Sequence, residues 1–111
     1  MFSLRSQGAV RVIAGDQALT ADSAAEAARL CDEALAQGQP RVVFDLQRIP
    51  LIDSAGLELL LDVGDRCTNR GGALHLAAPN ALCQDILRAT LLTDRFTIFR
   101  DALSAVGSFA Q

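Results

Sequence analysis

The sequence predicts an α/β fold in which a mixed sheet of four or five strands is packed by about four α-helices. Three observations indicate this class. The chain has 111 residues, which is enough for one modest hydrophobic core. Strand-like runs alternate with helix-like segments at short intervals, as expected for a largely parallel sheet. Residues 42–44 are consecutively apolar, as in a strand covered on both faces. We therefore expect residues 1–111 to form a single domain.

The first expected elements are a hairpin and a helix. FSLRS and AVRVIAG show rough apolar alternation on either side of a Gly-containing turn, which predicts a β-hairpin and makes the sheet mixed. From Ser23 to Gln37 the apolar residues recur with the period of a helix. Ser23 and Glu26 match the S-x-x-E pattern of a capping box, so we expect the helix to begin there.

Strands and helices continue to alternate along the rest of the chain. The remaining expected elements are, in order, a strand at 41–46, a helix at 54–69, a strand at 73–77, a helix after Asn80, a strand at 96–99 and a helix after Asp101. Asn80 and Asp101 are residue types that cap helix starts. Leu82 is expected on the apolar face of the helix that follows Asn80.

The composition argues against several classes of function. All ten basic residues are Arg, against thirteen Asp and Glu, so the net charge is −3 and we expect no nucleic-acid partner. Without Lys, neither a Walker-type phosphate site nor a Schiff base can form. The spacing of Cys31, Cys67 and Cys83 fits neither a zinc pair nor a redox pair, so we expect buried thiols. Met1–Arg11 lacks the features of a secretion signal and no apolar run approaches a membrane span, so we expect a cytoplasmic protein.

The usual signatures of catalysis and metal binding are weak. His75 is the one histidine and no cysteine is close to it in sequence, so we interpret it as structural. Ser54 lies in D-S-A-G-L rather than in the G-x-S-x-G elbow that exposes a nucleophile. Gly71 and Gly72 follow a helix instead of opening one, which is typical of a C-cap and not of a phosphate cradle. We expect no enzyme activity, no cofactor and no metal.

Asp53 and Ser54 stand where a loop enters the helix at 54–69. Either side chain can accept a hydrogen bond from the free amides of the first turn, so one interpretation is a simple N-cap. A second interpretation is functional, because the junction follows a central strand and α/β sheets bind ligands at that edge. A phosphate on Ser54 would lie at the positive end of a helix, which tolerates anions.

The helix at 54–69 has an unusually wide apolar arc. The stripe that we expect to face the sheet contains Leu57, Leu60, Leu61, Gly64 and Cys67. Leu59 and Val63 fall outside this stripe. Either a neighbouring helix covers them, or they form a partner-binding patch together with Arg66 beside Ser54.

The string VVFDLQRIPLIDSAGLELLL, from Val42 to Leu61, resembles the signature of the STAS domain family. This family is shared by sulfate transporters and bacterial anti-sigma factor antagonists. The order of elements from residue 1 to about 106 is also similar, as are LTADSAAEAARL, GGALHLAAPNALCQDILRATLL and DRFTIFRDAL. The resemblance implies a single STAS-type domain with a four- or five-stranded sheet, about four helices and no catalysis of its own.

The resemblance also implies a phosphorylation site. In the anti-sigma factor antagonists, the Ser after the motif's Asp is phosphorylated by an ATP-dependent serine kinase that is also the anti-sigma factor, and Ser54 matches that position. Ala55 stands where those proteins often have a second hydroxyl, and Thr20 where they tend to have an Asp. The expected partner-binding residues are Thr20, Asp53, Ser54, Ala55, Gly56, Leu59, Val63 and Arg66.

The function that these patterns favour is a bacterial, cytoplasmic protein-binding switch in signal transduction and transcription regulation. The expected partner is an anti-sigma factor/serine kinase, and the chain is expected to be a monomer in isolation. Two alternatives remain. One is a STAS subunit of a membrane transporter of the lipid ABC type, which would meet the membrane only through its partner. The other is a chemosensory-cluster STAS module with no sigma-factor role.

Overall fold

The computed structural model describes residues 1–36 and 38–110, and within them the chain forms a five-stranded sheet and four α-helices. The strands are β1 (Phe2–Gln7), β2 (Val10–Gly15), β3 (Arg41–Asp45), β4 (Ala73–Ala77) and β5 (Thr97–Phe99). The helices are α1 (Ala24–Ala34), α2 (Ser54–Asn69), α3 (Ala81–Ala89), the short 3-10 helix η1 (Leu92–Asp94) and α4 (Ala102–Ser108). The expected α/β class is confirmed.

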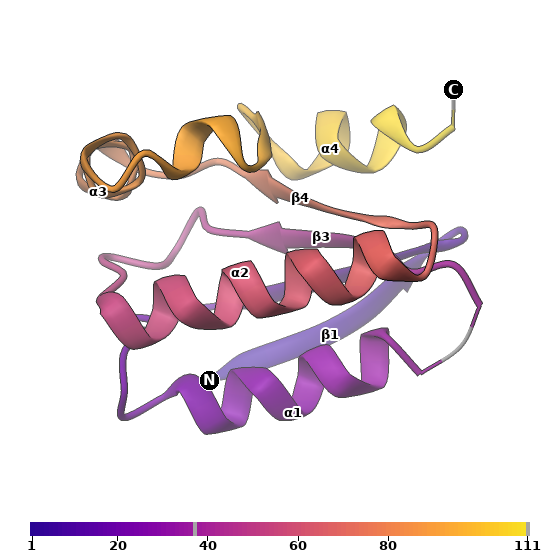
Figure 1. Cartoon of the computed structure of the whole chain (residues 1–111), viewed down its shortest axis with the longest axis horizontal. Helices are drawn as coiled ribbons and strands as arrows, with labels where there is room; N and C mark the ends of the chain where they lie inside the picture. Colours follow the sequence, from indigo (N-terminus) through magenta and orange to yellow (C-terminus); the bar gives the residue numbers. More distant parts are fainter. Residues whose placement is uncertain (37, 111) are drawn as a thin grey trace.

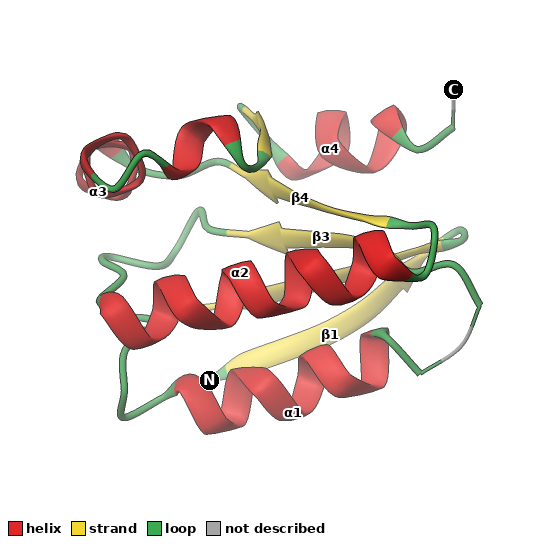
Figure 2. Ribbon diagram, in the orientation of Figure 1, coloured by secondary structure: helices red, strands yellow, loops and turns green. Residues whose placement is uncertain are grey.

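The sheet has the order β1-β2-β3-β4-β5 and is mixed (Figure 2). The hairpin makes β1 antiparallel to β2, whereas β2, β3, β4 and β5 run parallel to one another. The carboxyl ends of β3 and β4 therefore lie at the same end of the sheet, together with the start of α2 (Figure 1). This is the edge at which α/β sheets place their functional groups.

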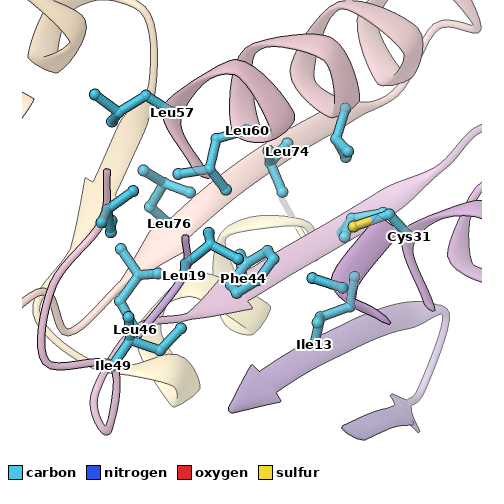
Figure 3. Packing of buried hydrophobic residues seen from close by; sticks show 14 of the residues in the cluster. Ile13, Leu19, Cys31, Phe44, Leu46, Ile49, Leu57, Leu60, Leu74 and Leu76 are labelled. Carbon is cyan, nitrogen blue, oxygen red and sulfur yellow. The ribbon is translucent and has the colours of Figure 1, made fainter. Parts of the chain in front are cut away.

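The sheet is covered on both faces, and β3 contributes to both sides. Val42 and Phe44 lie in the main core, which is packed by α1, α2 and α3 (Figure 3). Val43 points to the opposite face and joins a smaller cluster with Ala105 of α4. The consecutive apolar residues of this strand therefore reflect burial on two faces, as predicted.

The capping box predicted at Ser23 is wrong. The Ser23 hydroxyl accepts a hydrogen bond from the Thr20 amide at 3.0 Å and donates one to the Ala18 carbonyl at 2.7 Å. Glu26 turns away from the helix start, and its Oε2 accepts a hydrogen bond from the Phe2 amide at 3.2 Å. The amide at the start of edge strand β1 thus takes the carboxylate that a capping box would have used.

Other expected boundaries are close to those observed. The end predicted for the first helix at Gln37 lies outside the described residues. The caps at Asn80 and Asp101 are confirmed, because their Oδ1 atoms accept hydrogen bonds from the amides of Cys83 and Ser104 at 2.8 and 2.7 Å. Leu82 is 51% exposed and does not lie on the buried face of α3.

The three cysteines are buried and free, as predicted. Burial raises the pKa of the Cys31 thiol to about 12 and that of Cys67 to about 11. Burial also raises the pKa of Cys83. All three therefore remain protonated at neutral pH and contribute to packing rather than to thiol chemistry.

Candidate functional site

The loop before α2 is paired with the loop before α1. The Leu19 amide donates to the Leu51 carbonyl at 3.0 Å, and the Asp53 amide donates to the Leu19 carbonyl at 3.1 Å. Leu19 and Ile52 form an isolated parallel β-bridge. The pairing places Thr20, the residue after Leu19, beside the start of α2, so these two segments form one surface.

Asp53 is the N-cap of α2. Its Oδ1 accepts a hydrogen bond from the Gly56 amide at 3.0 Å, and its Oδ2 accepts one from the Ala21 amide at 3.1 Å. The bond from Gly56, followed by that from Ala21, lowers the pKa of the Asp53 carboxyl below its ordinary value. The carboxylate is therefore ionised at neutral pH, and each of its oxygens accepts a hydrogen bond from a backbone amide.

Gly56 is buried beneath the loop that precedes α1, which corrects its expected role in partner binding. A Cβ at this position would lie 2.3 Å from the Leu19 carbonyl oxygen and 2.7 Å from Cγ2 of Ile52. A side chain would therefore push the two paired loops apart. The glycine of the D-S-A-G-L motif is thus required by a close approach of backbone.

Ser54 is the first residue of α2 and is exposed, as predicted. Its hydroxyl makes no hydrogen bond to any residue within the described ranges, because Asp53 already supplies the cap. Ala55 beside it is half-buried, and Glu58 is exposed one turn further along. The sequence left open whether Asp53 or Ser54 is the cap, and the structure assigns that role to Asp53.

Val63 does not belong to an exposed patch, which corrects its expected place in a partner-binding surface and agrees with the alternative of cover by a neighbouring helix. It is 0% exposed and lies in the main core. The buried residues of α2 are Gly56, Leu57, Leu60, Val63 and Cys67. Because α1 packs alongside α2 (Figure 1), the apolar arc of α2 must cover a helix as well as the sheet.

Leu59 and Arg66 lie at the margin of the same helix pair. Leu59 is half-buried and packs against the main core. Nη1 of Arg66 lies 2.9 Å from Asp32 of α1 and 3.5 Å from Asp62 of α2, and all three side chains are substantially exposed. Arg66 therefore bridges α1 and α2 on the outside, and its ion pairs contribute little to stability.

His75 packs against the C-terminal segment of the described chain. Its ring stacks on Phe109 with centroids 4.3 Å apart, and its Nδ1 lies 2.9 Å from the Ser108 hydroxyl. Burial lowers the pKa of the imidazole below its ordinary value. Across residues 1–36 and 38–110, no three potential metal ligands come together.

No helix in the described part of the chain has both the length and the apolar character that a membrane span needs. The longest helix, α2, carries charged residues on its outer face, including Glu58 and Asp62.

A family model of the STAS domain matches residues 1–105. The chain belongs to the STAS domain family. Comparison with curated protein sequences found no match. Solved structures give the same fold: an anti-sigma-factor antagonist (STAS) domain protein from Planctomyces limnophilus has a TM-score of 0.91 at 22% identity, with 99% of this chain and 98% of that chain covered.

Three further solved structures share this fold. The anti-sigma factor antagonist SpoIIAA has a TM-score of 0.83 in its unphosphorylated form, at 17% identity over 99% of this chain and 96% of that chain. The Bacillus cell fate determinant SpoIIAA in its phosphorylated form gives 0.75, at 16% identity over 98% and 99%. A sulfate transporter family protein from Wolinella succinogenes gives 0.74, at 15% identity over 94% and 87%. At these identities the likeness establishes the fold.

Sequence reasoning missed the contribution of the loop before α1. The Ala21 amide and the Leu19 carbonyl both bind the start of α2, yet any residue type can supply a backbone group. A contact made only by backbone leaves no mark on residue identity at its own position. The one trace is Gly56, whose missing side chain makes room for Leu19.

Proposed function

We propose that this STAS domain, over residues 1–111, is a protein-binding switch that is turned off by phosphorylation of Ser54. The observation that carries the proposal is that Asp53, and not Ser54, caps the start of α2. Asp53 provides the cap, so the exposed hydroxyl of Ser54 is not needed for folding and remains accessible to an enzyme. The proposed partner is an anti-sigma factor that also acts as the serine kinase.

The proposed contact surface is centred on Thr20, Asp53, Ser54 and Ala55. The pairing of the two loops brings Thr20 to the side of Asp53, which makes one continuous surface from two segments distant in sequence. Leu59 lies at the margin of this surface, and Arg66 lies further along α2. The names of the STAS neighbours support the choice, since several are anti-sigma factor antagonists and one has been solved in a phosphorylated form.

The physical effect of the phosphate differs between folding and binding. At the first position of α2 the phosphate lies at the positive end of the helix, so the fold tolerates it. In an interface fitted to a neutral hydroxyl, the same dianion must lose its water shell beside the ionised Asp53. The proposed switch therefore acts on affinity and leaves the domain folded. We assign the domain no catalytic step, and we place it in the bacterial cytoplasm in a pathway that regulates transcription.

A second candidate function is a constitutive subunit of a membrane transporter. The observation in its favour is the fold shared with a sulfate transporter family protein. In that role Ser54 would contribute a neutral contact to a docking surface and would not be modified.

Affinity capture from separated cytosolic and membrane fractions distinguishes the two candidates. Immobilised parent and Ser54→Ala protein should retain the same cytosolic protein, whereas Ser54→Asp should not. Addition of ATP to the captured complex should place a phosphate on the peptide that contains Ser54 and release the partner. Retention of a membrane ATPase by all three proteins, without phosphate on Ser54, would instead assign the domain to a transporter.

A further inference from the structure

A pocket lies at the carboxyl ends of β4 and β5, between these strands, α3 and η1. It has a volume of about 320 Å³. The residues that line it are Ala78, Pro79, Gln84, Arg88, Thr93, Ile98, Phe99 and Arg100. This volume is within the range of sites that hold small molecules, roughly 300 Å³ and above. None of the residues in the proposed Ser54 surface lines it, so the hollow is not explained by the proposed switch.

The walls of this pocket combine an apolar floor with donor groups. Pro79 and Ile98 supply apolar surface, whereas the ring of Phe99 lies against His75 on the opposite face of the sheet. Arg88 and Arg100 also line the pocket, and none of the described residues that line it is acidic. A site with apolar walls and two guanidinium groups suits a ligand that carries an anionic group on an apolar body.

The two arginines keep donors free for such a ligand. Nη1 of Arg88 lies 3.1 Å from Asp85, and Nε of Arg100 lies 3.5 Å from Asp101. Each contact uses one nitrogen of a guanidinium, which has five N–H donors. The arginines also come from different elements, Arg88 from α3 and Arg100 from the segment after β5.

Backbone strain is concentrated around the same pocket. Across the described residues, the two non-glycine residues with positive φ are Ala78, at 55°, and Leu91, at 62°. Ala78 lines the pocket, and Leu91 is two residues before Thr93, which also lines it. The Ala78 amide donates to the Phe99 carbonyl at 2.8 Å, which holds the strained turn in place. Conformations of this kind cluster at ligand-binding sites.

We propose that this pocket binds a small organic anion, with its carboxylate or phosphate group bound by Arg88 and Arg100 and its apolar body on Pro79 and Ile98. The site is separate from the Ser54 surface, and the proposal does not depend on phosphorylation of Ser54.

Titration of the whole chain, followed by amide chemical shifts in NMR spectra, tests the proposal. The probes are phenylacetate and phenyl phosphate as anions with an apolar body, inorganic phosphate as the anionic group alone, and benzyl alcohol as the apolar body alone. Saturable shifts at the amides of Ala78, Thr93 and Arg100 are expected with at least one of the two aromatic anions. Comparison of these two anions shows whether the site prefers a carboxylate or a phosphate. Benzyl alcohol and inorganic phosphate should each bind at least tenfold more weakly.

Variants separate a true site from non-specific contact. Arg88→Gln and Arg100→Gln should each weaken binding of the preferred anion by about tenfold, the usual effect of losing a charge-assisted hydrogen bond. Arg29→Gln, an exposed arginine on α1, is the matched control and should leave affinity unchanged. The exposure of Arg88 and Arg100 makes loss of the fold unexpected, and a melting curve checks this. Absence of saturable shifts with both aromatic anions, or equal affinity in Arg88→Gln, Arg100→Gln and Arg29→Gln, would overturn the proposal.

Discussion

Asp53 Oδ2 accepts a hydrogen bond from the amide of Ala21 at 3.1 Å, across two loops that are 32 residues apart in the chain. The other oxygen of the same carboxylate caps α2 through the Gly56 amide. One ionised side chain therefore fixes the start of α2 and holds the loop before α1 against it. The shape of the surface around Ser54 depends on this contact.

Protonation of Asp53 in acid should lower the free energy of unfolding of the parent protein. The pKa of this carboxyl is lowered from its ordinary value of 3.8, so its stabilising effect is complete above that value and is lost as pH falls through the lower folded-state pKa. Denaturant unfolding between about pH 2 and 7 should show that the free energy of unfolding falls less at low pH for Asp53→Asn than for the parent. The control Asp22→Asn, an exposed carboxylate in the turn before α1, should follow the parent. Identical acid profiles for the parent and Asp53→Asn would contradict the assignment.

Gly56→Ala should destabilise the domain by about 1 to 3 kcal/mol, because the new methyl group would meet the Leu19 carbonyl and Ile52. The matched control is Gly107→Ala in α4, where a Cβ has no atom within 4 Å. Alanine favours helix over glycine, so the control should be neutral or stabilising by up to about 1 kcal/mol. Urea unfolding measures both, and a Gly56→Ala protein as stable as the control would show that the loops do not approach this closely.

Val63→Arg should unfold the domain or cost several kcal/mol, because it places an unpaired charge in the core between α2 and its neighbours. Glu58→Arg on the exposed side of the same helix is the control and should stay within about 0.5 kcal/mol of the parent. Circular dichroism on heating distinguishes the two. A Val63→Arg protein with the same melting temperature as the parent would contradict the burial of Val63 in the core.

His75 should make the docking of α4 sensitive to mild acid. Burial lowers the folded-state pKa below the ordinary value of 6.5, so the unfolded chain takes up the proton first. Stability is therefore complete above about pH 7 and falls as pH drops from the unfolded pKa towards the folded one. His75→Phe, which keeps a ring against Phe109 but cannot titrate, should lack this dependence. If the free energy of unfolding depends on pH in the same way for the parent and His75→Phe between about pH 5 and 8, this role of His75 is contradicted.

Local patterns in the sequence predict most of the fold. The consecutive apolar residues of β3 and the caps at Asn80 and Asp101 depend on short-range rules, and the structure confirms them. The same rules predict an acceptor at the entry to α2, since a free helix start needs one, but they do not choose between Asp53 and Ser54.

The misjudged residues are those whose partners are distant in the chain. For Val63 the sequence leaves open cover by a neighbouring helix or a partner-binding patch, and the packing of α1 on α2 favours the first. Glu26 did not form a capping box because the amide of Phe2, at the sheet edge, takes its carboxylate. The contact of Ala21 with the Asp53 side chain uses the backbone amide of Ala21, so the identity of residue 21 does not record it.

Titration of the captured partner with the parent, Ser54→Ala and Ser54→Asp proteins tests the switch most directly. The free energies of unfolding of all three proteins should agree within about 1 kcal/mol. An anion at the helix start stabilises the fold by roughly 0.3 to 1 kcal/mol, and repulsion from the adjacent Asp53 opposes this effect. Ser54→Ala should bind like the parent. Ser54→Asp should lose at least thirtyfold in affinity, or about 2 kcal/mol, from desolvation of the new charge. Equal affinities for Ser54→Ala and Ser54→Asp, with all three proteins folded, would contradict the account and leave Ser54 as a neutral surface residue.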